Sequence, residues 1–464
     1  MSIRTLHIGR TGLKAASYGV DVTGQNVTNA STEGYVRRRL VQQTRAPHRN
    51  EHGVFTGQGV TAAAVHRDID RFATERCYES LGDQSMASTA HETLSIVEAT
   101  FREGDTASIA DRLDRFFDAA TELTSEPSDH GLRLSLRDAG KNLADAVNRG
   151  GNALIESIRR AEDRINDEVT GVNNILNDMR ELHERISDSN AVTGPADLMD
   201  ARDGLAQQLA EKIGVDVDYQ ANGQLSLFVG GHAIVQEVHV RELSAVNSTG
   251  VTGDLSVKIQ VDNGTVTIDQ FLKGEIGGLV AARDQMKSTL DDLDTFADDF
   301  VDEINSEHGG GFDAYGIPGL DFFTIPAAAT HASLDMSLDA ALAGDANLIA
   351  AAGSPGAEVG DGENLQNILD VEDRKLFTTS SQTSREFVAS LYSDLGNAIV
   401  GFEVDAATHG AIVNDLVSLK EASSNVDLDE EAVSLIQYQA AYQAAARVVT
   451  AADDLLSELM QMVR

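Results

Sequence analysis

Residues that could do chemistry are plentiful in this chain, but none stands in the spacing of a catalytic or nucleotide-binding motif. Phosphate-binding loops, the H-E-x-x-H zinc motif and the G-x-S-x-G serine motif are all absent from the sequence. The Gly309–Gly311 run lacks the strand-to-helix context of a dinucleotide loop. Asp216-x-Asp218-x-Gln220 resembles the start of a calcium loop, but Ala221 stands where that loop needs glycine. We therefore predict no catalytic, cofactor-binding or metal-binding residues.

The remaining reactive side chains have simpler interpretations than catalysis. The carboxylates are so numerous that a solvated acidic surface explains them better than any catalytic pair. His308 lies in a glycine-rich segment, where hydrogen bonding to the backbone is a simpler prediction than metal binding. The single cysteine, Cys77, excludes an internal disulfide framework and is expected to be a half-buried apolar residue. The run Arg37-Arg38-Arg39 could pair with a partner's carboxylates, and an exposed strand edge without a partner is the alternative.

Length and charge limit the class of protein. The 464 residues are 42% hydrophobic, which suits two to four domains with buried cores. The net charge of −38 makes nucleic acid and anionic membrane surfaces poor partners. No run of 18 apolar residues occurs, and the first 25 residues lack the layout of a secretory signal. We expect neither membrane insertion nor export by a cleaved signal peptide.

The elements that organise the chain lie at its two ends, beginning with a helix predicted over 425–464. An apolar residue recurs every seven positions in this stretch, at Leu428, Leu435, Tyr442, Val449, Leu456 and Val463. A second track holds Tyr438, Ala445, Ala452 and Leu459. This spacing favours a coiled coil, and a stripe with so many alanines needs another helix to pack against.

The N-terminal segment has a stripe with the same spacing. It contains Leu6, Leu13, Val20 and Val27, with Ile3, Ala16 and Ala30 on a neighbouring track. Four glycines interrupt this segment, and each weakens a helix by about 1 kcal/mol relative to alanine. We therefore expect the two ends to be poorly ordered in an isolated monomer and to become ordered on assembly. An ordinary helix pair that caps the protein's own core fits the periodicity equally well.

Between the two ends, periodicity predicts long helices around a small β unit. Helical spacing covers 68–123, 132–186, 195–213, 279–304 and 391–419, and Gly150-Gly151 is expected to bend or break the longest helix. Alternating apolar residues flank Asn222-Gly223 and Asn263-Gly264, which predicts two β-hairpins. The predicted fold class is mainly α with a small antiparallel β unit. The molecule is expected to be elongated, with a long-helix bundle in the middle and the N- and C-terminal helices paired as a coiled coil.

These patterns divide the chain into three predicted parts. Residues 1–38 and 426–464 form a terminal coiled-coil domain. Residues 39–213 and 273–425 form a mainly helical middle domain, and residues 214–272 form the small β unit.

Five blocks of sequence carry a resemblance to a known family. The block from Asn26 to Tyr35 is similar to the N-terminal signature of flagellar rod, hook and junction proteins, with Glu33 where proline is usual. Blocks at 198–203, 274–279, 305–323 and 425–448 resemble the flagellar hook-associated protein 1 family, the bacterial hook–filament junction proteins. The resemblance runs from one end of the chain to the other.

This resemblance implies a structural axial protein that joins hook to filament by helical self-assembly, without catalysis or cofactors. The protein would be extracellular, in the flagellum, after export through the flagellar type III apparatus. Its partners would be further copies of itself in a helical ring, the hook protein, a second junction protein on the filament side and a dedicated export chaperone on the C-terminal helix.

The terminal stripes give the expected site residues. The assembly interface would contain Ile3, Leu6, Leu13, Val20, Val27, Leu428, Leu435, Tyr442, Val449, Leu456 and Val463. The chaperone would contact Leu435, Tyr438, Tyr442, Val449, Leu456 and Leu459. Two alternatives stay open: another rod or hook axial subunit, and a secreted hydrolase with flagellar-type termini, which would need two placed carboxylates or a metal cluster in a cleft.

Overall fold

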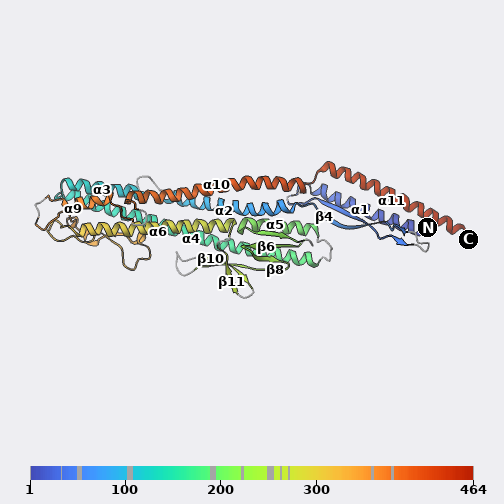
Figure 1. Cartoon of the computed structure of the whole chain (residues 1–464), viewed down its shortest axis with the longest axis horizontal. Coiled ribbons are helices and arrows are strands. Elements are labelled where there is room, and N and C mark those ends of the chain that lie inside the picture. Colours follow the sequence, from blue (N-terminus) through green and yellow to red (C-terminus); the bar gives the residue numbers. More distant parts are fainter. Residues whose placement is uncertain are drawn as a thin grey trace.

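The molecule is an elongated, mainly helical structure whose two chain ends lie together at one tip (Figure 1). The computed structural model describes residues 2–32, 34–49, 55–101, 108–188, 195–220, 224–247, 255–261, 264–269, 272–356, 360–377 and 381–462. The chain runs out along the bundle and returns, which brings the N- and C-terminal helices together (Figure 1). None of the helices in these ranges combines the length and apolar character needed to cross a membrane.

Long helices make up most of the molecule. They are α1 (Ser2–Asn29), α2 (Arg71–Phe101), α3 (Ile109–Ser125), α4 (His130–Asp188), α5 (Ala196–Ile213), α6 (Gly274–Gly309), α9 (Glu363–Asp373), α10 (Ser384–Ser424) and α11 (Leu428–Met462). Short helices α7 (Ala332–Asp335) and α8 (Ala340–Gly344) follow α6. Helix α10 begins with a capping box. The Thr383 side chain accepts a hydrogen bond from the Glu386 backbone N–H, and the Glu386 side chain accepts one from the Thr383 backbone N–H.

The part of the bundle distant from the chain ends is held by a cluster of buried phenylalanines. Phe116 of α3 packs edge-on against Phe300 of α6 and Phe322, with ring centroids 6.0 and 5.5 Å apart. The sequence predicts a bend or a break at Gly150-Gly151, and the break is wrong, because α4 continues through both glycines. A Cβ on Gly151 would lie 2.8 Å from Leu334 and 2.9 Å from Ser333 of α7. The glycine therefore permits close packing of α7 and does not interrupt the helix.

The predicted β unit consists of two small antiparallel sheets that pack on the bundle. One has the order β5-β6-β7-β8 and the other β11-β10-β9. Both predicted hairpins form, β5 with β6 and β10 with β11, although Asn222, Gly223 and Asn263 lie outside the described residues. Asn173 of α4 binds both backbone groups of Leu243, at 2.9 Å each, and so fixes the second sheet to α4. The strands are β5 (Asp216–Tyr219), β6 (Leu225–Val229), β7 (His232–Gln236), β8 (His239–Val240), β9 (Leu243–Asn247), β10 (Leu255–Val261) and β11 (Gly264–Thr267).

The tip with the chain ends contains α1, α11 and a ribbon of four strands. β1 (Arg38–Thr44) pairs with β4 (Val60–Arg67), and β2 (His48–Arg49) pairs with β3 (Phe55–Thr56). The ribbon leaves the end of α1 and runs back along it (Figure 1). We refer to residues 36–67 as the arm.

Candidate functional site

The two terminal helices pack side by side and antiparallel, and glycines of α1 form the contacts. A Cβ added to Gly9 would lie 2.8 Å from Val449, and one on Gly12 would lie 3.3 Å from Ala445. A Cβ on Gly19 would lie 2.4 to 2.6 Å from ring atoms of Tyr438. The glycines that weaken α1 as an isolated helix are therefore the positions that let α11 approach it closely.

The predicted assembly and chaperone residues differ in their exposure within one copy of the chain. Seven are half-buried: Leu6, Leu13, Val20, Leu435, Tyr438, Val449 and Leu456. Four are exposed: Val27, Leu428, Tyr442 and Leu459. The Ile3 side chain and Val463 lie outside the described residues. Tyr438 and Val449 contact α1, so part of the heptad stripe of α11 packs on the chain's own N-terminal helix.

A second apolar stripe runs along an exposed side of α11, next to the residues that contact α1. It consists of exposed residues at helical spacing, and we name it the outer stripe: Val433, Ala440, Ala444, Ala451, Leu455, Leu459 and Met462. Val433 is 56% exposed, Leu455 53% and Met462 77%. Apart from Leu459, the heptad tracks do not include these residues, because the tracks form the more regular pattern. Their spacing of three, four or seven residues was the signal that could have found them.

The N-terminal signature forms a hydrogen-bonded cluster, here called the clasp, between α1, β1 and α11. The buried Asn26 amide donates to Glu431 Oε2 at 3.1 Å and to the Arg38 carbonyl at 2.8 Å. Its oxygen accepts from the Arg38 N–H at 3.0 Å and from the Tyr35 hydroxyl at 2.9 Å. Burial raises the pKa of Tyr35. Every hydrogen-bonding position of the Asn26 side chain is thus used to tie the two chain ends together.

The arginine run pairs with carboxylates of its own chain. Arg37 donates from Nε to Glu431 at 2.8 Å and from Nη1 to Glu430 at 2.7 Å. Arg39 pairs with Asp68 at 2.7 Å. These ion pairs contradict the alternative of a strand edge without a partner, and pairing with a partner's carboxylates stays a prediction.

A second cluster, the arginine joint, links the arm to α5. Arg38 pairs with Asp197 and, at 3.0 Å, with Asp200. Arg67 pairs with Asp200 at 2.6 Å and with Asp203 at 2.7 Å. Both arginine side chains are buried, and burial of two cations requires such partners. The block at 198–203, singled out in the sequence for its resemblance alone, supplies Asp200 and Asp203.

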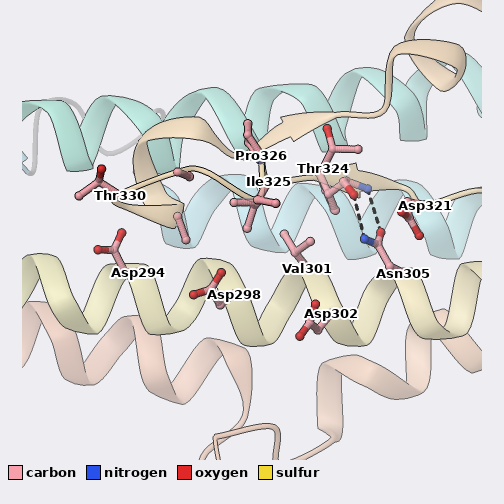
Figure 2. Close-up of a pocket in the computed structure, with 14 residues that line it drawn as sticks. Asp294, Asp298, Val301, Asp302, Asn305, Asp321, Thr324, Ile325, Pro326 and Thr330 are labelled. Carbon is pink, nitrogen blue, oxygen red and sulfur yellow. Dashed lines mark hydrogen bonds between the residues drawn. The ribbon is translucent and has the colours of Figure 1, made fainter.

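One cavity, of about 490 Å³, is an acidic cleft between α6 and the segment 321–332 (Figure 2). Asp294 on one wall binds His331 and Ser333, and Asn305 holds the backbone of Phe322 and Phe323. Asp298 and Asp302 also line the cleft, and burial, then the neighbouring carboxylates, raises the pKa of Asp298. Within the described ranges no three His, Cys, Asp or Glu side chains are placed to hold a metal ion.

The isolated reactive side chains serve the fold. His308 donates from Nδ1 to the Leu320 carbonyl at 2.5 Å and accepts from the Ala350 N–H at Nε2, 2.9 Å away, which confirms the predicted backbone bonding. Burial lowers its pKa. Cys77 is fully rather than half buried, and burial raises its pKa. Asp216 and Asp218 lie in β5, and Ala221 lies outside the described residues.

Comparison with known proteins gives consistent similarities. The helical domain of flagellar hook-associated protein FlgK matches residues 94–323, and the C-terminal region of flagellar basal body rod FlgEFG proteins matches 421–462. Flagellar hook-associated protein 1 of Escherichia coli (strain K12) is 24% identical over 97% of this chain and 98% of its own length. The Bacillus subtilis (strain 168) protein of that name is 26% identical over 98% of this chain and 97% of its own.

A solved structure shares the fold. The flagellar hook junction protein FlgK from Burkholderia pseudomallei superimposes with a TM-score of 0.66 at 15% identity, covering 75% of this chain and 99% of that structure.

Proposed function

Because the chain belongs to the flagellar hook-associated protein 1 family, whose members are structural proteins of the hook–filament junction, we propose that its terminal helix pair is the surface through which copies assemble. The outer stripe carries this proposal. It extends along α11 as seven apolar or small side chains that are all exposed in one copy of the chain. Such a stripe on a helix that already packs on α1 provides a face for a neighbouring subunit.

We propose that the interface combines the outer stripe with the exposed members of the heptad stripe. Val27, Leu428 and Tyr442 are accessible to a neighbour, whereas the half-buried heptad residues would act by holding α11 on α1. Residues 1–38 with 426–464 would then be the terminal domain, 39–213 with 273–425 the middle domain and 214–272 the β unit. Burial between copies would stabilise the assembled state over the monomer.

The partners follow from the place of the family in the flagellum. We propose contacts with the hook protein on one side and with a second junction protein on the filament side, in a helical ring of copies. Export would use the flagellar type III apparatus without a cleaved signal peptide. A dedicated chaperone would cover α11 before export, at Leu435, Tyr438, Tyr442, Val449, Leu456 and Leu459. The role is structural, without catalysis, cofactor or metal.

Two adjacent leucines test the proposal. Leu455 is 53% exposed on the outer stripe, and Leu456 is half-buried on the side of the fully buried Ala452. We expect L455D to leave the monomer folded, with an unchanged circular dichroism melt, while cells lose their filaments. L456D introduces a carboxylate into the α1–α11 contact and should also loosen the monomer. Normal filament attachment in cells with L455D would refute assembly through the outer stripe.

A further inference from the structure

The arm is a basic element in a strongly acidic protein. Residues 36–67 contain six arginines and one glutamate, so the arm carries a net charge of +5 and the rest of the chain −43. Four of the six arginines form ion pairs with carboxylates of the same chain. Arg37 pairs in the clasp, Arg38 and Arg67 pair in the arginine joint, and Arg39 pairs with Asp68. Arg45 and Arg49 remain as exposed cations.

These two cations lie near others from α1, at the tip that holds the two chain ends. Arg45 Nη1 lies 3.1 Å from His7 Nε2, and Arg4 donates to the Thr56 hydroxyl at 3.1 Å. The Arg49 guanidinium lies 5.9 Å from the centroid of the Phe55 ring. Their partners are thus an imidazole, a hydroxyl and an aromatic ring. Within the described ranges no carboxylate lies at ion-pair distance from these arginines, although the chain has 74 Asp and Glu residues.

We propose that this basic surface of the arm docks against the acidic surface of a second copy of the chain. In a head-to-tail contact between identical subunits, two different surfaces meet. Two copies of net charge −38 repel each other unless a positive surface of one faces a negative surface of the next. The arm adjoins the α1–α11 pair, so this contact would continue the apolar interface of the outer stripe. The inference rests on the proposed assembly of copies and adds which charged surfaces face each other in that assembly.

Zero-length cross-linking between amines and carboxylates tests the contact directly. R45K and R49K keep the charge and place an amine in the arm, and Lys14 is a native amine in α1. Hook–junction complexes isolated from cells with these variants are cross-linked beside the purified monomer and analysed by mass spectrometry. We expect links from position 45 or 49 to carboxylates of the same protein, present in the complex and absent from the monomer.

Links from these positions only to hook or filament subunits would overturn the choice of a second copy. No links from them, in a sample where other intersubunit links form, would overturn docking of the arm altogether. In cells, R45E/R49E should lose filament attachment, whereas R159E/R180E makes the same charge change on exposed sites of α4 and should retain it. If R45E/R49E cells keep their filaments while L455D cells lose them, the electrostatic contact fails and assembly through the outer stripe stands.

Discussion

Two glycines of the same helix give opposite predictions when each is replaced by alanine. A Cβ on Gly19 would lie 2.4 to 2.6 Å from the Tyr438 ring, whereas a Cβ on Gly24 would have no atom within 4 Å. Alanine gains about 1 kcal/mol of helix stability over glycine at either position. At Gly19 this gain is opposed by overpacking of roughly 1–3 kcal/mol, because the near ring atoms of Tyr438 cannot move away without moving α11. G24A should therefore stabilise the helix pair, and G19A should leave it unchanged or destabilise it.

Hydrogen exchange of the α1 and α11 amides measures this difference without requiring the whole chain to unfold in one step. The two variants should differ by about 1–3 kcal/mol in opening free energy, which is roughly a 5- to 150-fold difference in exchange rate. Amides of α4 serve as an internal reference and should not change. If G19A slows exchange in α1 as much as G24A does, the close helix contact at Gly19 does not exist in solution. Fast exchange throughout α1 and α11 in the parent monomer would instead support the expected disorder of the free ends.

Two further predictions concern buried polar groups. E431Q removes the charge that binds both Asn26 and Arg37, and should lower the opening free energy of the α1 and α11 amides by about 1–3 kcal/mol. E430Q changes an exposed carboxylate and should lower it by less than about 1 kcal/mol. Equal effects of the two variants would contradict the clasp. Burial lowers the pKa of His308 from its ordinary value of 6.5, so below pH 6.5 the unfolded chain takes up a proton that the folded chain excludes. The contribution of neutral His308 to the free energy of unfolding is therefore fully present above pH 6.5 and is lost as the pH falls below it. Thermal unfolding at pH 7.5 and 5.5 should show a smaller loss for H308Q than for the parent chain, and an identical loss would refute the role of His308.

The long elements could be predicted because their physics is local. An apolar stripe at helical spacing identifies a helix wherever it packs, and β10 and β11 follow from alternating residues around Asn263-Gly264. Gly151 shows the limit of local reasoning. Its helix propensity is poor, but α4 continues through it, and a Cβ at this position would lie 2.8 Å from Leu334, which is far away in the sequence.

The clasp and the arginine joint could not be derived from the sequence, because their members lie far apart along it. Asn26 and Glu431 are 405 residues apart, and Arg38 and Asp197 are 159 apart. A chain with twice as many acidic as basic residues offers each arginine many possible carboxylates, and composition alone does not select one. Resemblance marked the blocks that contain Asn26, Glu431 and Asp203, but only the fold assigns Asn26 to Glu431 and Arg67 to Asp203.

The terminal domain therefore combines little apolar burial with many specific polar contacts. Few of its side chains are fully buried, among them Ala15, Ala16 and Ala452, and the close helix approach uses glycines. Buried ion pairs and hydrogen bonds add little net stability against water, but a wrong register would leave them unpaired and is penalised strongly. The clasp thus fixes how α11 lies on α1 without making the pair very stable. Such a pair can unfold for export at small free-energy cost, and in the proposed assembly a neighbouring copy on the outer stripe would supply the burial that the pair lacks.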